Sequence, residues 1–501
     1  MQVQNQNYVG INKWLALFVV VIGTFMAMLD SNIINIAIPN LMAVFSVSLQ
    51  DIKWIITAYS LALAAIIPLT GFLGEIFGTK KLYIYALAMF TFGSLLCGFS
   101  WSNTSMIVFR IIQALGGGMI MPVGMSIIFQ IFPMEERGTA MGFWGIASMA
   151  APAIGPTLGG YIIQYMDWRM IFYVNVPIGI LGVLLGSILL KSSPTKPFKS
   201  FDFIGFITSI LGLVSLLYVL GEGSSIDWGD IKYPLLLAFG IFNLLIFVAN
   251  ELTIKDPMLD LRVLKIFNFS ASQIVTSFNG MAFMGGIYVL PLFLQSIRGY
   301  SPMESGIILF PAAIASGIMM PLSGKLLNKL GVRKLTIPGL IIVAAASYQL
   351  SFLNMNTAKE TITLIAMVRG LGLGICMMPV NTAGLNSVPM PLVGKASALS
   401  NTIRQVAQAL SITIMTTLIQ SKMDYSYAIL SAQITVFNRT ASEIIKHFPD
   451  SALSMISQSI HLQAYNDAMN YAIAIASFAV VGSIITVMFM RDTIIAKPKI
   501  Q

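Results

Sequence analysis

The stretch GFLGEIFGTKK at residues 71–81 returns 253 residues later as GKLLNKLGVRK at residues 324–334. In both places a short basic turn joins two long apolar runs. Two more pairs recur at offsets of 259 and 256 residues: RIIQALGGG from Arg110 with RGLGLG from Arg369, and GTAMGFWGIA from Gly138 with GKASALSNTI from Gly394. Because the members of each pair keep the same orientation, the sequence predicts two parallel halves related by an axis along the membrane normal.

The apolar runs around this repeat fill nearly the whole chain. Of its 501 residues, 56% are hydrophobic and 10% are charged, and the mean hydropathy is +0.83. A soluble chain is about 25% charged, so this composition excludes a soluble fold. Runs of roughly 20 apolar residues can cross a bilayer core about 30 Å thick. We expect an all-α integral membrane protein whose fourteen spans lie near residues 14–38, 54–73, 82–100, 104–130, 139–163, 170–190, 203–221, 233–250, 268–294, 303–323, 335–353, 361–383, 397–420 and 467–490.

The basic residues predict the orientation of these spans. With the N-terminus in the cytoplasm, 18 of the 29 Lys and Arg fall in cytoplasmic segments and 8 in outer segments. Short loops rich in Lys and Arg stay inside, so we expect both termini in the cytoplasm and an even number of spans. The net charge of +9 is spread through these loops, and nucleic acid is therefore not expected as a partner. The prediction is a multi-pass monomer in the cytoplasmic (inner) membrane.

Two polar stretches, SSPTKPFKS and KDPMLDLRVLK, indicate the boundaries of the halves. Fourteen spans minus two six-helix halves leave two helices between these stretches. A late segment carries charges among helically spaced apolar residues, which is typical of short helices on a membrane surface. The predicted parts are an N-terminal half at 1–195, two inserted helices at 196–255, and a C-terminal half at 256–501 with an outer loop at 421–466.

Asp30 is the one acidic residue that lies well inside a predicted span. An ionised side chain there costs roughly 2.5–3.5 kcal/mol on insertion scales, and protonation removes most of that cost. A carboxylate whose surroundings change can therefore load and release a proton. We interpret Asp30 as a proton-coupling residue; the alternative is a structural polar contact with a neighbouring helix.

Arg110 is the expected partner of Asp30. At 1.5 Å per residue, Asp30 lies about 13 Å and Arg110 about 9 Å from the outer ends of their helices. We expect Arg110 to face the cavity and to stabilise the ionised form of Asp30 when it is close. A fixed anchor for helix ends is the alternative role. Gln113, on the same helix face as Arg110, and Asn35 are expected to line a water-filled substrate cavity.

Glu222, Glu75 and Arg137 are the other charged residues for which the sequence suggests a role. Glu222 could be a second proton site only if its end of the helix is buried. Glu75 and Arg137 face the predicted cytoplasm, where a carboxylate paired with a basic neighbour could close an inner gate; exposed loop charge is an equal alternative. Cys97 and Cys376 fall inside apolar runs and suggest neither a disulfide nor a metal site.

Five motifs in order now support a family resemblance. They are LDSNIINIAIP (29–39), GFLGEIFGTKK (71–81), RIIQALGGG (110–118), GPTLGG (155–160) and DWRMIFYVNVPIG (167–179). With these motifs the chain resembles the major facilitator superfamily, and within it the fourteen-helix drug:proton antiporters of the QacA and EmrB type. The resemblance covers the whole chain.

The resemblance implies roles for individual residues. Asp30 stands at the family's acidic position in helix 1, and Arg110 at its arginine in helix 4. The helix 5 motif associated with antiporters is represented by Gly155, Pro156, Gly159 and Gly160. The inner-gate loop is represented by Gly71, Glu75, Gly78 and Lys80, with Arg137 beyond it. Here the family usually has Asp then Arg where Glu75 and Ile76 stand, and a later Arg where Thr79 stands, so its charge network is altered.

The function that the resemblance implies is proton-coupled multidrug efflux by an antiporter that exports lipophilic or cationic small molecules. Export of one endogenous lipid, peptide or siderophore is the alternative, and a membrane sensor or enzyme is a remote one. No nucleophile motif or nucleotide loop is present, so we expect a transporter rather than an enzyme, with the proton gradient in place of a cofactor. A periplasmic adaptor would be needed only in a host with an outer membrane.

Overall fold

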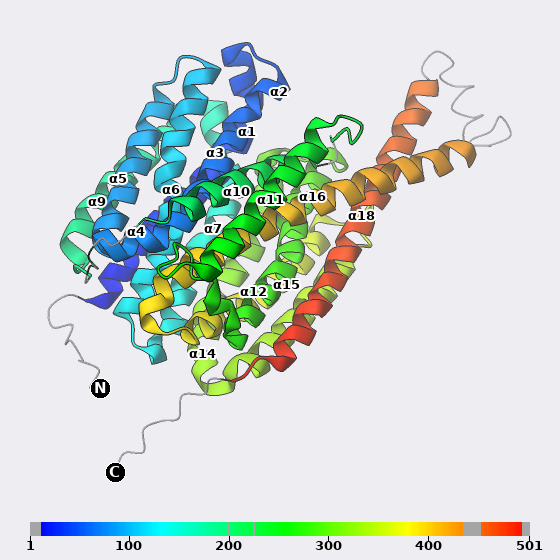
Figure 1. Cartoon of the computed structure of the whole chain (residues 1–501). Helices are drawn as coiled ribbons and strands as arrows, with labels where there is room; N and C mark the ends of the chain where they lie inside the picture. The colour runs from blue at the N-terminus through cyan, green and yellow to red at the C-terminus, as the bar shows by residue number, and fades with distance from the viewer. Residues whose placement is uncertain are drawn as a thin grey trace.

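The computed structural model describes residues 12–193, 195, 197, 201–223, 226–433 and 452–492, and every regular element within them is helical (Figure 1). The first elements are α1 (Lys13–Phe45), α2 (Leu49–Ile52), α3 (Trp54–Ile66), η1 (Ile67–Leu69), α4 (Thr70–Phe77), α5 (Thr79–Gly98), α6 (Asn103–Ile131), α7 (Met134–Tyr165), α8 (Met170–Tyr173), α9 (Asn175–Leu189), α10 (Phe203–Glu222) and α11 (Lys232–Thr253). The later elements are η3 (Leu261–Lys265), α12 (Phe267–Met284), η4 (Gly285–Val289), α13 (Leu290–Ser296), α14 (Pro302–Leu350), α15 (Lys359–Asn386), η5 (Met390–Leu392), α16 (Val393–Gln433) and α18 (Ala452–Phe489).

Twelve helices among the described residues are long and apolar enough to cross a membrane. One of them, α14, has 49 residues and would measure about 73 Å, more than twice the thickness of a bilayer core. Helix α16 contains the predicted span at 397–420, but it is not one of these twelve helices. The all-α membrane fold is confirmed, whereas the count of fourteen spans stays a prediction.

A glycine divides α14 at a place that the repeat predicts. Gly331 interrupts the helix with φ 79° and ψ 168°, and Gly78 adopts φ 79° and ψ 144° between α4 and α5. The two glycines are 253 residues apart, which is the offset of the motif that contains them. Only glycine adopts this left-handed region without steric cost. The two halves therefore turn in the same way at equivalent positions.

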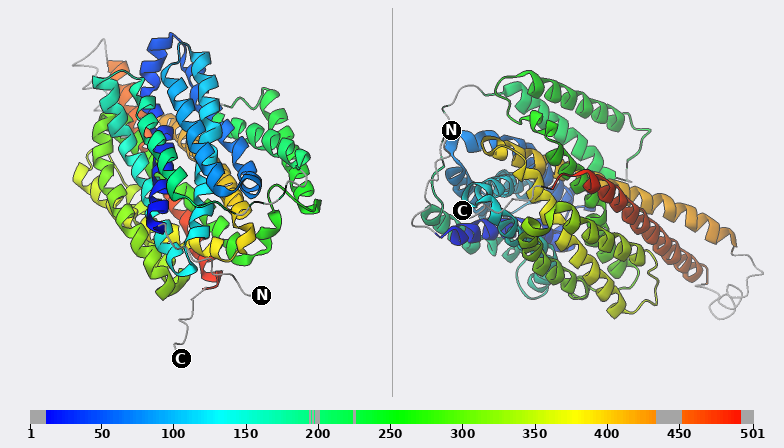
Figure 2. Two further views of the ribbon diagram at one scale, coloured as in Figure 1. Left: turned by 90° about the vertical axis from the view of Figure 1, so that its left-hand side faces the viewer. Right: turned by 90° about the horizontal axis from the view of Figure 1, so that it is seen from below.

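The helices form two groups with an inserted pair beside them. In the N-terminal group, α1 to α9, helix α1 packs against α6, α7 and α9, and α5 packs against α6 and α9. In the C-terminal group, α12 to α18, helix α14 packs against α15 and α18, and α12 packs against α15, α16 and α18. Helices α10 and α11 lie together at the edge of the bundle, where α10 contacts α3 and α16 (Figure 2). The boundaries near residues 195 and 255 stay predictions.

Helix α1 begins and α18 ends at one end of the bundle, here called the terminal end, opposite the far end (Figure 1). Lys13 Nζ lies 2.5 Å from Glu136 Oε2 at the start of α7. The side-chain amide of Asn328 in α14 donates to the backbone carbonyl of Glu135. The turn that divides α14 also hydrogen-bonds Asp492, just beyond α18. Three helix ends and the turn that divides α14 therefore meet at the terminal end.

The described parts of the predicted outer segment at 421–466 are helical, as expected, but they belong to two long helices and not to short separate ones. Helix α16 continues without a break to Gln433, and α18 begins at Ala452, so both run well past the predicted ends of their spans. The two helices pack against each other, and both extend beyond the rest of the bundle at the far end (Figure 1). Pairing along this length stabilises the amphipathic sequence as two long helices. The rest of the predicted loop, 434–451, lies outside the described residues.

Candidate functional site

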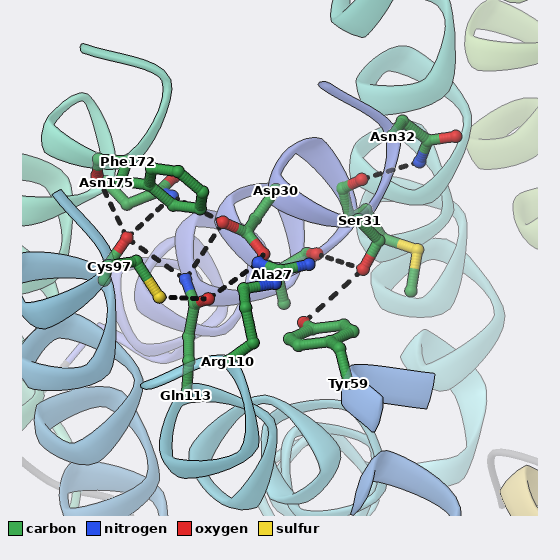
Figure 3. Close-up of polar contacts among 12 residues, drawn as sticks. Ala27, Asp30, Ser31, Asn32, Tyr59, Cys97, Arg110, Gln113, Phe172 and Asn175 are labelled. Carbon is green, nitrogen blue, oxygen red and sulfur yellow. Dashed lines mark hydrogen bonds and ion pairs between the residues drawn. The ribbon is translucent and has the colours of Figure 1, made fainter. Parts of the chain in front are cut away.

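Asp30 and Arg110 form a buried ion pair in the middle of the N-terminal group. Arg110 Nη1 lies 2.6 Å from Asp30 Oδ2, and both side chains are almost completely excluded from solvent (Figure 3). Asp30 comes from α1 and Arg110 from α6. Two charges removed from water are stable only if they satisfy each other and find further hydrogen bonds. The sequence placed both residues at similar depths, and the structure joins them directly.

Two uncharged side chains complete the hydrogen bonds of Asp30. Gln113 Nε2 donates to Asp30 Oδ1 over 2.9 Å, and Asn175 Nδ2 donates to the same oxygen over 3.0 Å. Both amides also donate to Ser94 Oγ over 3.1 Å, and Ser94 Oγ donates to the carbonyl of Phe172. The carboxylate of Asp30 therefore accepts from three side chains, from α6 and α9, inside a site that water does not reach.

Arg110 has partners other than Asp30. Its Nη1 donates to Gln113 Oε1 over 2.7 Å, and its guanidinium carbon lies 3.8 Å from the centre of the Tyr59 ring (Figure 3). An arginine over the face of a buried aromatic ring is attracted by the ring's electrons. Tyr59, from α3, is itself buried and lies 3.5 Å from Ser31 Oγ. The guanidinium could therefore keep two of its contacts if Asp30 lost its charge.

Sequence reasoning found three members of this cluster and missed three. Asp30, Arg110 and Gln113 were predicted, but Gln113 is fully buried against Asp30 and is not one of the described residues that line the cavity between the two groups. The missed members are Tyr59, Ser94 and Asn175. Asn175 gave one usable signal, because an amide within the apolar run of α9 needs a buried partner.

A cavity of about 490 Å³ lies between the two groups, in the half of the bundle nearer the far end. Asn35 lines it, as predicted from the sequence, together with Asn32 from the same helix and Pro156 from α7. Helices α12 to α15 supply the opposite wall, which includes Arg369. Most of the lining is apolar, which is the usual character of a small-molecule site. Asn32 and Asn35 follow Asp30 on α1, so one helix carries both the ion pair and part of the cavity wall.

The two groups touch closely at the terminal end. Gly138 of α7 and Gly324 of α14 pack backbone to backbone, and a Cβ on either glycine would overlap the carbonyl oxygen of the other. A similar contact joins Gly71 of α4 to Lys395 of α16, whose Cα would lie 2.9 Å from a Cβ on Gly71. The repeat relates the two contacts, since Gly71 corresponds to Gly324 and Gly138 to Gly394. Both crossings depend on the absence of a side chain.

Polar contacts between the groups surround these glycines. Glu75 Oε2 lies 3.8 Å from Lys395 Nζ, and Arg137 donates to Asn386 Oδ1 over 3.0 Å. Arg137 also donates to the backbone carbonyl of Phe129 over 2.9 Å, which fixes the direction of its side chain. Glu75 and Arg137 therefore both reach across from the N-terminal group to the C-terminal group.

The sequence and the arrangement of helices both have counterparts among known proteins. A family model described as Major Facilitator Superfamily matches residues 20–412. The chain belongs to the major facilitator superfamily. The uncharacterized MFS-type transporter YhcA of Bacillus subtilis is 37% identical over 463 residues, which cover 92% of this chain and 86% of YhcA. The multidrug export protein EmrB of Escherichia coli K12 is 31% identical over 427 residues, which cover 84% of this chain and 83% of EmrB.

A solved structure gives the same result for the fold. The crystal structure of the human organic anion transporter MFSD10 has a TM-score of 0.64 and covers 95% of this chain and 100% of that chain, at 11% identity. A likeness at this identity concerns the fold alone. The family resemblance predicted from the sequence is confirmed, and this superfamily member is a multi-pass membrane transporter and not an enzyme.

The glycines of the helix 5 motif of this transporter do not all have the same surroundings. Cβ atoms on Gly155 and Gly159 would meet α1, at Asn32 Cβ (3.1 Å) and Ile33 Cγ1 (2.8 Å) respectively. Gly160 has no atom within 4 Å of such a Cβ. The motif therefore allows α7 to approach the helix that carries Asp30, with Gly160 outside that contact.

Gly78 and Lys80 were predicted for the inner gate, and Glu222 for a second proton site. Gly78 forms the turn described above, and Lys80 Nζ donates to the carbonyl of Ser187 in α9 over 2.7 Å. Both belong to the N-terminal group and do not bridge the two groups. Glu222 ends α10 with a partly exposed side chain, so it does not meet the burial condition set for a second proton site. No cluster of three metal-ligand side chains occurs among the described residues.

Proposed function

We propose that this transporter exports lipophilic small molecules in exchange for protons, and that Asp30 carries the proton. The observation that supports this role is the ion pair between Asp30 and Arg110, fully buried on a helix that also lines the cavity. An intramembrane carboxylate with a cationic partner is a common device for proton transport. The relative EmrB is named a multidrug export protein, which supports export as the direction.

The surroundings of Asp30 suit two protonation states. In the ionised state the carboxylate has Arg110, Gln113 and Asn175 as donors. In the protonated state Asp30 keeps the two amide donors, while Arg110 retains Gln113 Oε1 and the Tyr59 ring. Protonation leaves Arg110 with an amide and a ring as partners but removes its counter-charge, and the free-energy cost of that buried charge favours a rearrangement of the helices around it. Water must reach Asp30 for the exchange, which requires the helices around it to move.

The proposed cycle uses the two ends of the bundle in turn. We place the terminal end in the cytoplasm, as the excess of Lys and Arg there favours. The contacts of Gly138 with Gly324 and of Glu75 with Lys395 then close the cytoplasmic side, and the cavity lies beyond them toward the outside. Rocking of the two groups would break these contacts and open the cavity to the cytoplasm, as in other transporters built from repeats.

The substrate range follows from the cavity. Its lining contains more apolar than polar side chains, from helices of both groups, and this suits guests with a large apolar surface. No carboxylate occurs among the described residues that line it. We therefore propose lipophilic compounds as the substrates and do not extend the proposal to cations.

The proposal can be tested in proteoliposomes with three compounds that share an apolar body: pyrenebutyrate, pyrenebutyramide and pyrenebutyl trimethylammonium. We expect at least one of them to drive a pH change across the membrane with the wild type, and the change to disappear in Asp30→Asn. Asp167→Asn is the matched control, because Asp167 is exposed and forms an ion pair with Arg169. An undiminished proton signal in Asp30→Asn, or transport by the wild type without proton movement, would overturn the proposal.

A further inference from the structure

Arg369 is a second buried arginine, and it lines the cavity. It comes from α15 and is 7% exposed. Its Nε donates to Ser347 Oγ over 3.0 Å, and its Nη2 donates to the backbone carbonyl of Ala282. Its Nη1 makes no hydrogen bond to the residues that the structure describes. The guanidinium is therefore held in place by uncharged groups and keeps one nitrogen unused.

Among the described residues, no acid balances the charge of Arg369. Within the described part of the chain, no carboxylate lies within 4.0 Å of its guanidinium. Arg369 is also the only charged residue among the described residues that line the cavity. Burying a guanidinium without a counter-charge is unfavourable, and the cost is recovered when an anion binds.

The repeat shows where a counter-charge would have been. Arg369 corresponds to Arg110 in the N-terminal half, and the three offsets place the equivalent of Asp30 within 283–289. That segment reads FMGGIYV and contains no acid. Its central residue, Gly286, lies against Arg369, since a Cβ there would overlap Nη1. The C-terminal half therefore keeps the arginine of the buried pair and replaces the acid with a glycine.

The backbone at this place differs from a regular helix. Gly285–Val289 forms a π-helical turn, η4, within the run from α12 to α13. Such turns recur at functional sites because they displace side chains from the regular helix surface. Gly286 and Tyr288 of this turn both line the cavity. The position equivalent to Asp30 therefore lies beside Arg369, in the wall of the cavity.

A second polar group of the cavity also lacks a partner. Ser305 of α14 is 1% exposed, and its Oγ makes no hydrogen bond within the described part of the chain. Ser305 lines the same cavity as Arg369. A buried hydroxyl without a partner is costly, so its position suggests that a ligand atom or water supplies the bond.

We propose that Arg369 binds a carboxylate of the transported compound. This carboxylate takes the place beside Arg369 that the carboxylate of Asp30 has beside Arg110. This inference rests on the proposed function, because it treats the cavity as the substrate site. Arginine suits the role, since its planar fork matches a carboxylate and its charge does not depend on pH. The apolar walls hold the rest of the molecule, and Ser305 supplies a further polar contact. The expected substrate class is amphiphilic carboxylates.

Equilibrium binding of the same pyrene compounds to purified protein in detergent, measured by calorimetry without any proton gradient, tests this proposal. The wild type should bind pyrenebutyrate about tenfold more tightly than pyrenebutyramide, because a hydrogen bond to a charged group is worth about 1.5–3 kcal/mol. Arg369→Gln should lose this preference and keep its affinity for pyrenebutyramide. Arg369→Lys should recover part of it. The cationic compound should bind least tightly to the wild type.

Arg404→Gln is the matched control. It distinguishes the effect of removing the charge in the cavity from the effect of removing another arginine. Arg404 of α16 is partly buried and donates to Asn401, but it does not line the cavity. Arg404→Gln should leave both affinities unchanged. Equal binding of pyrenebutyrate and pyrenebutyramide by the wild type would overturn the proposal without any variant, and so would an equal loss of both in Arg369→Gln. Since binding is measured without a gradient, a failure here differs from the loss of proton coupling that tests Asp30.

Discussion

The carboxylate of Asp30 accepts hydrogen bonds from Arg110, Gln113 and Asn175 in a region that excludes water. Neither member of the ion pair is stable there alone, because a single buried charge keeps its full desolvation cost. The amides of Gln113 and Asn175 stabilise the carboxylate but cannot neutralise it. The charge of Asp30 and the charge of Arg110 are therefore expected to be energetically coupled.

This coupling predicts a pattern in a double-mutant cycle. Arg110→Gln and Asp30→Asn should each destabilise the protein by about 3–5 kcal/mol, since each leaves one charge buried without its partner. The double variant Asp30→Asn/Arg110→Gln contains neither charge and should be more stable than both single variants. The measurement is the apparent melting temperature of the purified transporter in detergent.

The exposed pair of Lys13 and Glu136 provides the control for this cycle. Their side chains are 32% and 38% exposed, so Lys13→Gln and Glu136→Gln should each change stability by at most about 1 kcal/mol. If the double variant of Asp30 and Arg110 were the least stable of the set, with simply additive effects, the two buried charges would act independently. That result would contradict the pairing on which the role of Asp30 depends.

The sequence could identify the charged members of the site but not their neutral partners. Asp30 and Arg110 are conspicuous because a charge within a span has a large free-energy cost. Ser94 and Asn175 carry no charge, and uncharged polar residues are common in apolar helices. Their role depends on α5 and α9 packing beside α1, which is long-range information that no local pattern in the sequence contains.

At the level of elements, the repeat predicted the turns better than the helix lengths. Gly78 and Gly331 have the same φ in the two halves, because the basic turn has one backbone geometry. The segment from 421 suggested short helices on the membrane surface, since charges stand among its helically spaced apolar residues. In the structure α16 and α18 pair along this segment, so the contact between two helices overrides the local signal.

The glycine crossing of α7 and α14 predicts a conformational effect. Gly324→Ala places a Cβ against the backbone of Gly138, which cannot rotate away as a side chain could. The added methyl should destabilise the closed terminal end by about 1–3 kcal/mol relative to the open state. In the native protein the side chain of Asn328 hydrogen-bonds the backbone of Glu135 across this end. Disulfide cross-linking between Glu135→Cys and Asn328→Cys therefore measures how much of the protein has the terminal end closed. Cross-linking should fall by roughly fivefold or more.

Gly160→Ala is the control for this element, because a Cβ at Gly160 meets no atom within 4 Å. It adds the same methyl group to α7 and should leave cross-linking unchanged. Cys97 and Cys376 are buried and should not compete for the oxidant. Equal cross-linking in Gly324→Ala and the wild type would show that the glycine crossing does not control closure.

For the whole molecule, the two halves share one architecture but differ in charge at equivalent places. The N-terminal half keeps both members of its buried ion pair, Asp30 and Arg110. The C-terminal half keeps Arg369 alone, beside the cavity. Proton coupling and substrate recognition are thus proposed to use one inherited arrangement in two ways. A substrate carboxylate at Arg369 would lie in the cavity, and a proton on Asp30 would lie behind the opposite wall, on the helix that carries Asn32 and Asn35.

The orientation of the whole molecule and the crossing of the inserted helices can be tested together. We predict that a membrane-impermeant maleimide labels Trp228→Cys, between α10 and α11, and Asp167→Cys in intact cells. Lys191→Cys and Asp256→Cys, before α10 and after α11, should react only after permeabilisation. All four positions are exposed, and the two native cysteines are buried. The expected pattern follows because α10 and α11, at 20 and 22 residues, are each long enough to cross the bilayer.

The four positions report on different parts of the prediction. If Trp228→Cys reacted like Asp256→Cys, helices α10 and α11 would not cross the membrane, and the count of fourteen would be wrong. If all four positions reacted with reversed sidedness, the terminal end would face outward and the closed end would be the outer gate. Asp167 and Lys191 lie on either side of α9, which crosses in both cases, so their difference confirms that the reagent separates the two faces. The orientation matters for the mechanism, because it decides from which side Asp30 receives its proton.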